Sequence, residues 1–373
     1  MTDERPIVPG AEVDHETIHG DGVDLHVAAA GPEDGDPVLL LHGFPDFWFG
    51  WRHQIPALVG AGYRVYAPDL RGVNESDAPE GVSLYGIDDL AGDALAVIDA
   101  AGGGPVEVVG HDWGGGVAWW LATGYPERVE RVVAVNAPHP VAMERRVLRD
   151  PLQALRSSYF AAFAVPEAPE RLLEAADWRL TWEILTSGAR QEAFGDAELY
   201  DYRRAWDRTD AASLLAPYRA ALRDSPVPHE PHVAPPAAIM WGLDDPAFSP
   251  GIVDDTADLC ADATTVRFSG AGHWLHREAP EDVNDLLVRL LDGEDRRENA
   301  SESSARTGAT ADAAGGTGGA GTAESESESE SESESESESG ATGGTDPDGG
   351  NSTAAVTADD DGADEERAEA GPE

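Results

Sequence analysis

The chain has 373 residues and a formal net charge of −47, with 72 acidic residues against 25 basic ones, all of them arginine. A surface this negative repels nucleic acid and anionic membranes, so we expect neither as a partner. A hydrophobic fraction of 41% excludes a wholly disordered chain, and the length suffices for one large domain with an insertion or for two domains.

Six short apolar runs in the first 293 residues predict buried strands. They cover residues 37–43, 63–69, 105–112, 130–136, 237–242 and 264–270. Near-continuous apolar runs are typical of parallel strands that are covered on both faces. Helical patterns lie between them, at residues 50–61, 86–101, 114–124, 252–261 and 280–292. This alternation predicts an α/β fold with a doubly wound, mostly parallel sheet.

The interval 138–232 interrupts this alternation, because it contains no clear strand but several helical stretches rich in Trp, Tyr, Leu and Arg. Ligands of open α/β sheets bind at the carboxyl ends of the strands, so an insertion here is expected to cover the site. The predicted domains are therefore a core formed by residues 1–137 and 233–293, and a helical lid formed by residues 138–232.

The composition changes abruptly after Gly293. Residues 324–339 repeat Glu-Ser, and the surrounding residues offer almost nothing to bury, so we expect residues 294–373 to be a disordered acidic tail. Without this tail, residues 1–293 still carry 49 acidic and 21 arginine side chains, a net charge of −28. Salt screens such self-repulsion, so the charge indicates a halophilic protein in a salty cytoplasm. The alternative, an acidic segment that awaits a basic partner, suits the tail better than the body.

Four features of the sequence limit the possible classes of protein. Cys260 is the single cysteine, which excludes an intrachain disulfide and a cysteine metal cluster. The acidic N-terminus MTDERPIVPG lacks the apolar region of a signal peptide, and no stretch approaches the about 18 apolar residues of a membrane span. No metal-ligand spacing such as HExxH occurs. We therefore predict a cytoplasmic protein, monomeric or homodimeric, with no metal or cofactor.

Three polar residues follow predicted strands in an order that indicates hydrolytic chemistry. Asp112 follows the run that begins at residue 105, Asp245 lies in WGLDDP, and His273 lies in GAGHW. Nucleophile, acid and histidine is the order of the α/β-hydrolase triad. Gly110 and Gly114 flank Asp112 as a nucleophile elbow requires, because the strand and helix backbones approach closely at such a turn.

With these motifs the sequence resembles the epoxide hydrolase branch of the α/β-hydrolase family, from about residue 20 to residue 292. The motifs are HGFP at 42–45, GHDWGG at 110–115 and GHW at 272–274. A carboxylate nucleophile suits this activity because it forms an ester that water can hydrolyse, whereas a serine would form an ether. The resemblance implies an α/β-hydrolase fold that hydrolyses an epoxide to a vicinal diol through a covalent ester on Asp112.

The resemblance also implies roles for the residues around the nucleophile. His273, held by Asp245, would deprotonate the water that attacks the ester. The backbone amides of Phe44 and Trp113 would form the oxyanion hole, and the side chains of Phe44, Trp113 and Trp274 would bind the apolar part of the substrate. His42, Gly43 and Pro45 would shape the loop that carries Phe44, with a cis Phe44–Pro45 bond.

Two lid tyrosines complete the resemblance. An alkoxide is a poor leaving group unless it is protonated as the C–O bond breaks, and the family supplies the proton from tyrosine hydroxyls. Tyr159 in SSYFAAF and Tyr218 in LLAPYRAAL match the positions of this pair. The pair favours an epoxide hydrolase over other hydrolases with an aspartate nucleophile.

The residues alone leave alternatives. Asp244 competes with Asp245 as the acid, His276 competes with His273 as the base, and the tyrosines could be ordinary lid aromatics. A haloalkane or haloacid dehalogenase uses the same Asp–His–Asp arrangement, although Trp113 and Gly116 stand where fluoroacetate dehalogenases carry arginines. A further alternative function is that of a non-catalytic receptor of the same fold, which binds a small ligand under its lid.

Overall fold

The computed structural model describes residues 5–190, 192–195, 197–223 and 231–293. Its centre is an eight-stranded sheet in the order β1-β2-β4-β3-β5-β6-β7-β8. The six predicted apolar runs form the parallel strands β3 (Pro37–Leu41), β4 (Arg64–Pro68), β5 (Val106–His111), β6 (Val129–Val135), β7 (Ala237–Gly242) and β8 (Ala263–Phe268). The predicted α/β class and the mostly parallel sheet are confirmed.

An antiparallel hairpin at one edge was not expected from the sequence. β1 (Val13–His19) pairs with β2 (Asp24–Ala30), and β2 runs antiparallel to β4. β1 contains no apolar run, because its sequence, VDHETIH, is polar and its side chains are exposed or half-buried at the edge of the sheet. β2 is buried from Leu25 onward but ends in three alanines, a residue that is depleted in strands.

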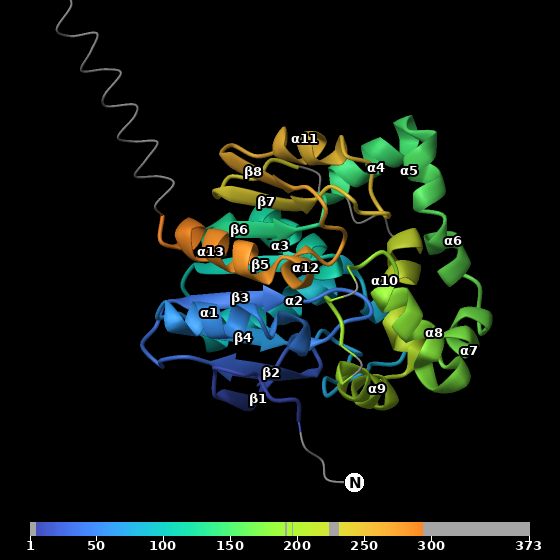
Figure 1. Cartoon of the computed structure of the whole chain (residues 1–373), viewed down its shortest axis with the longest axis horizontal. Helices are drawn as coiled ribbons and strands as arrows, with labels where there is room; N and C mark the ends of the chain where they lie inside the picture. Colours follow the sequence, from blue (N-terminus) through green and yellow to red (C-terminus); the bar gives the residue numbers. More distant parts are fainter. Residues whose placement is uncertain (1–4, 191, 196, 224–230, 294–373) are drawn as a thin grey trace, which may run out of the picture. The chain divides into compact units, whose positions relative to one another are not determined.

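Helices cover both faces of the sheet, as the doubly wound prediction requires. Figure 1 shows α1 (Gln54–Gly60) and α13 (Pro280–Leu291) over one face, with α2 (Ile87–Ala100) and α3 (Trp113–Gly124) over the other. The predicted helix 50–61 is divided between η1 (Trp48–Trp51) and α1. The other short helices of this part are η2 (Val82–Leu84), η3 (Pro126–Arg128), α11 (Ile252–Ala257) and α12 (Leu275–Glu278).

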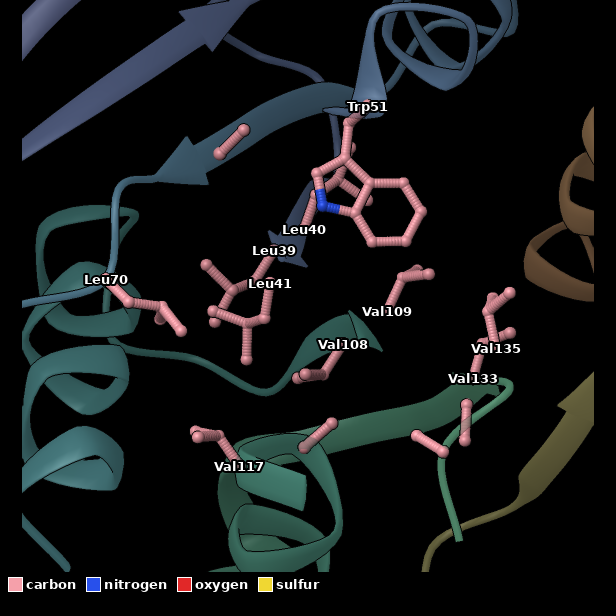
Figure 2. Packing of buried hydrophobic residues seen from close by; sticks show 14 of the residues in the cluster. Leu39, Leu40, Leu41, Trp51, Leu70, Val108, Val109, Val117, Val133 and Val135 are labelled. Carbon is pink, nitrogen blue, oxygen red and sulfur yellow. The ribbon is translucent and has the colours of Figure 1, made fainter. Parts of the chain in front are cut away.

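The central strands hold the site through a dense apolar core. Figure 2 shows β3 and β5 side chains, including Leu40 and Val108, between Trp51 of η1 and Val117 of α3. Leu40, Val108 and Val117 have no solvent exposure. Full burial of a Leu or Val side chain contributes about 1.5–3 kcal/mol, so the end of β5 is firmly fixed.

The described residues between 138 and 232 contain helices and no strand. Figure 1 shows most of them gathered at one end of the sheet. They are α4 (Pro140–Arg149), α5 (Pro151–Arg156), α6 (Tyr159–Phe163), α7 (Ala168–Leu173), α8 (Ala175–Thr186), α9 (Glu198–Arg208) and α10 (Ala211–Arg223). The predicted acidic tail, residues 294–373, lies outside the described residues. Among the helices that the structure describes, none has the length and hydropathy to cross a membrane.

Candidate active site

Asp112 occupies the tight turn between β5 and α3. Its backbone has φ 50° and ψ −120°, a conformation that is strained for a residue with a side chain. The turn requires two glycines: a Cβ on Gly110 would lie 2.3 Å from the carbonyl oxygen of Gly114, and one on Gly114 would lie 2.2 Å from that of Leu41. This close approach of strand and helix places the Asp112 carboxylate at the apex of the turn.

The two carboxylate oxygens of Asp112 have different neighbours. The Phe44 backbone N–H donates to Oδ1 at 2.9 Å, while Nε2 of His273 lies 3.6 Å from Oδ2. Burial opposes ionisation, but the neighbouring His273 outweighs it and lowers the pKa of Asp112 to about 2. The carboxylate is therefore ionised at neutral pH, as a nucleophile must be.

His273 is held by a buried acid. Its Nδ1 lies 2.9 Å from Oδ2 of Asp245, which also accepts a 2.7 Å hydrogen bond from the side-chain amide of Asn136. The backbone N–H of Ala247 donates to the other oxygen of Asp245 at 2.7 Å. Burial lowers the pKa of His273, but the charges of Asp245 and Asp112 outweigh it and raise the pKa to about 10. The resting site therefore contains an imidazolium between two carboxylates.

Two further side chains fix the loop that carries His273. Glu278 accepts hydrogen bonds from the backbone N–H groups of Gly272 and Trp274, each at 3.0 Å. His111 Nε2 lies 2.9 Å from the His273 carbonyl oxygen, so this nitrogen carries the proton and donates it. Burial, with the charge of His273, lowers the pKa of His111 to about 3 and keeps its ring neutral.

The loop before α1 places the Phe44 amide beside the Asp112 carboxylate. The predicted cis Phe44–Pro45 bond is confirmed. The Leu70 N–H donates to His42 Nε2 at 3.0 Å, so the proton is on Nδ1, which donates to the Gly43 carbonyl oxygen at 3.0 Å. A Cβ on Gly43 would lie 2.3 Å from that of Asp112, so only glycine allows this approach.

A cavity of about 500 Å³ opens onto Asp112. Trp113, Tyr159 and Tyr218 line it, together with Phe160 and Phe248. The Tyr159 and Tyr218 rings lie 5.9 Å apart, and burial, with the charge of Asp112, raises the pKa of both hydroxyls. Both tyrosines therefore carry their protons at neutral pH.

Two of the predicted substrate contacts, Phe44 and Trp274, pack against other aromatic rings. Trp274 is buried, with its ring 4.7 Å from that of His111 and 5.6 Å from that of Phe194, and it is not among the described residues that line the cavity. The Phe44 ring packs 5.3 Å from that of Tyr218, and the Phe44 backbone N–H donates to Asp112. The roles of Phe44 and Trp274 in substrate binding stay predictions.

The contacts to Asp112 and within the acid–histidine pair involve Asp245 and His273. Nδ1 of His273 lies 2.9 Å from Asp245 Oδ2, and Nε2 of His273 lies 3.6 Å from Asp112 Oδ2. His276 is buried with its ring 4.5 Å from that of His111. The geometry therefore favours Asp245 and His273. Within the part of the chain that the structure describes, no group of three or more His, Cys, Asp or Glu could hold a metal ion.

Comparison with known proteins agrees with this geometry. The family described as the alpha/beta hydrolase fold matches residues 36–280. "Epoxide hydrolase 4" of Mus musculus is 34% identical over 290 residues, which are 75% of this chain and 80% of the mouse protein. The chain belongs to the α/β-hydrolase family, in its epoxide hydrolase branch.

Other members of the α/β-hydrolase family extend the match. The AB hydrolase superfamily protein YfhM of Bacillus subtilis is 39% identical over 275 residues, covering 74% of this chain and 96% of that protein. Bacillus megaterium epoxide hydrolase in complex with an inhibitor gives a TM-score of 0.69 at 31% identity, covering 74% of this chain and 100% of that one. Epoxide Hydrolase A from Mycobacterium thermoresistibile gives 0.67 at 29% identity, covering 76% and 99%. These matches confirm the predicted fold.

Proposed function

We propose that this hydrolase converts an epoxide to a vicinal diol. One observation carries the proposal: a single cavity holds the ionised carboxylate of Asp112 and two protonated tyrosines, Tyr159 and Tyr218. Such a set suits a strained ether, because the ring carbon needs a nucleophile while the ring oxygen needs a proton. The similarity to proteins named as epoxide hydrolases supports the same activity.

The first half-reaction forms an ester. An Asp112 carboxylate oxygen attacks a ring carbon, the C–O bond of the epoxide breaks, and the leaving oxygen takes a proton from Tyr159 or Tyr218. The product is a hydroxyalkyl ester of Asp112 and one tyrosinate. The charge on Asp112 is then lost, so the proton on His273 is less tightly held and passes, through solvent, to the tyrosinate.

The second half-reaction hydrolyses the ester. Neutral His273, oriented by Asp245, takes a proton from water as the hydroxide attacks the Asp112 carbonyl carbon. The backbone amides of Phe44 and Trp113 stabilise the oxyanion. Collapse releases the diol alkoxide, which takes the proton of the newly formed acid, and leaves ionised Asp112 with protonated His273.

We also infer the setting of the enzyme. Residues 1–293 carry a net charge of −28, and all their basic side chains apart from histidine are arginine, which supports a halophilic enzyme in a salt-rich cytoplasm. We infer that it acts as a monomer or homodimer, that residues 138–232 form its lid, and that residues 294–373 form a disordered acidic tail.

The proposal is tested by removing both proton donors. In Tyr159→Phe with Tyr218→Phe, kcat/KM for styrene oxide should fall by about 10²–10⁴-fold, the usual contribution of general acid catalysis. Tyr200→Phe, at an exposed lid tyrosine, is the control and should leave kcat/KM unchanged. Near-normal turnover in the double variant would contradict the role of the two tyrosines.

The same assays separate the competing functions. Halide release from haloalkanes or haloacids without epoxide turnover would favour the dehalogenase, which needs no proton donor for its leaving group. Tight binding of an epoxide without turnover in the unmodified chain would favour the receptor. The pair of tyrosines in the cavity is the feature that neither alternative requires.

A further inference from the structure

Three successive glycines follow Trp113 in α3, and only two of them are explained by packing. A Cβ on Gly114 would lie 2.2 Å from the Leu41 carbonyl oxygen, and one on Gly115 would lie 2.1 Å from the Cβ of Ala137. At Gly116, by contrast, nothing lies within 4 Å of such a Cβ apart from the adjoining residues and the nearby backbone of its own helix. Glycine destabilises a helix interior relative to alanine, so Gly116 lowers stability without a steric need in the core.

The space beside Gly116 belongs to the cavity. Gly116 lines it one helical turn beyond Asp112, on the face of α3 that also carries Trp113. The lid side of this region is formed by apolar residues of α4 and α10: Met143, Val147, Leu148, Ala221 and Leu222. The cavity therefore extends past the nucleophile into an apolar space that a side chain at position 116 would occupy.

The formal charges of the cavity have one sign. Among the described residues that line it, Asp112 and Glu144 are the acidic ones and none is arginine or histidine. A carboxylate on the substrate would lose hydration in this space, and apolar side chains offer no hydrogen bond or opposite charge to compensate for that loss. The negative charge of Glu144 would also repel it. A negatively charged substrate arm is therefore disfavoured in this space.

We propose that Gly116 keeps this space open for the apolar arm of a bulky, uncharged epoxide, and that Gly116 thereby sets the substrate class. This inference rests on the proposed function. Gly116 would determine specificity without taking part in the reaction. The apolar arm of the substrate lies along α3 over Gly116, while the epoxide ring is held between Asp112 and the two tyrosines.

The test uses three substrates that share one reacting group, the methyl, 1-naphthyl and 4-carboxyphenyl glycidyl ethers. In the full chain, kcat/KM should be highest for the naphthyl ether. In Gly116→Leu, the naphthyl-to-methyl ratio of kcat/KM should fall by at least about tenfold, as steric exclusion from an apolar pocket typically gives. Gly124→Leu is the matched control. An added Cβ at Gly124 would likewise meet no neighbouring segment within 4 Å, and Gly124 lies in the same helix but is not among the described residues that line the cavity. That variant should keep the ratio.

Two further measurements keep the outcome decisive. Gly116→Ala should raise Tm, because alanine favours the helix, and should lower the ratio by less than leucine does. Binding of the naphthyl diol, measured by calorimetry, should weaken at least about tenfold in Gly116→Leu and needs no chemistry. If no epoxide is hydrolysed, the proposed function fails while diol binding still tests Gly116. An unchanged ratio with unchanged diol binding, or equal turnover of the carboxyphenyl and naphthyl ethers, would overturn the inference.

Discussion

In the proposed mechanism His273 is protonated before the ester forms and acts as a base afterwards, and its neighbours explain how it can do both. In the resting site Nδ1 lies 2.9 Å from Asp245 and Nε2 lies 3.6 Å from Asp112. These charges, against the opposing effect of burial, raise the pKa of His273 to about 10. An ester on Asp112 carries no charge, so the pKa of His273 falls when the intermediate forms, and the side chain becomes a base.

The two half-reactions should therefore respond differently to pH. The pKa of Asp112, lowered to about 2, keeps the nucleophile ionised far into acid, and the raised pKa values of the tyrosines keep them protonated. Hydrolysis needs neutral His273, so its rate falls as pH falls through the pKa of His273 in the ester. We predict that the covalent enzyme accumulates at about pH 5 and not at about pH 8, as seen by rapid quench and mass spectrometry. Parallel pH profiles for both steps would contradict this.

At this scale the sequence reveals residues whose chemistry has a local pattern. Asp112 could be predicted because its flanking glycines mark the elbow, and His273 because it follows a strand and an Ala-Gly turn. Asn136 and Glu278 could not, because their roles depend on tertiary contacts: Asn136 bonds Asp245, 109 positions away. The position of Asn136 at the end of a predicted strand was the one indication of its role in the sequence, whereas no sequence pattern indicated the role of Glu278.

Among the elements, α9 connects the lid helices to two loops of the site. The Tyr202 hydroxyl donates to Oδ1 of Asp46 at 2.7 Å, and the Trp206 indole N–H donates to the Pro45 carbonyl oxygen at 2.8 Å. Glu198 also pairs with Arg277 of α12 at 2.5 Å. These contacts hold the loop that carries the Phe44 amide, and they hold the helix that begins two residues after His273.

Removal of one such contact should weaken both the fold and the reaction. Tyr202→Phe deprives the buried Asp46 carboxyl of a donor, so the free energy of unfolding should fall by about 1–3 kcal/mol. Hydrolysis of the ester should slow, because the Phe44 amide is less firmly placed. Urea unfolding and single-turnover kinetics measure the two effects, with the exposed Tyr200→Phe on the same helix as control. Unchanged stability in Tyr202→Phe would show that α9 does not anchor the loop through this bond.

A helix or strand could be predicted where the residue pattern of its own short segment is sufficient to identify it. The strands β3 to β7 are largely apolar because both faces are covered, so runs of Val, Leu and Ile identify them. β8, with the sequence ATTVRF, lies at the other edge of the sheet and is half-buried, not buried as its run predicted. β1 was not predicted because this edge strand has polar side chains, and β2 was not predicted because it ends in three alanines. The division of the described lid helices was beyond the sequence, since helices of five or six residues such as α5 and α6 are stable only through packing.

For the whole molecule, the surface charge sets the conditions of stability. Residues 1–293 carry a net charge of −28. The Debye length is about 30 Å at 0.01 M salt and about 3 Å at 1 M, so low salt exposes the folded chain to its own repulsion. Carboxylates are rarely buried without a partner, so most of this charge lies at the surface.

We predict that Tm rises from about 0.05 M to molar salt, and that activity is lost together with the fold as salt is removed. A chain that ends at Gly293 should behave like the full chain, because the body alone has a large negative charge. Calorimetry in potassium chloride measures the effect. Equal stability and activity across this range would remove the halophilic interpretation and leave the acidic surface in need of a basic partner.

The covalent ester on Asp112 is the central claim, and one single-turnover experiment tests it most directly. With enzyme in excess over styrene oxide in ¹⁸O-labelled water, the oxygen added to the substrate should come from the Asp112 carboxylate. The diol of the first turnover should then contain no label, and mass spectrometry of the peptide containing Asp112 should show one incorporated ¹⁸O. Labelled diol with an unlabelled Asp112 peptide would mean that water attacks the epoxide directly, and Asp112 would not be the nucleophile.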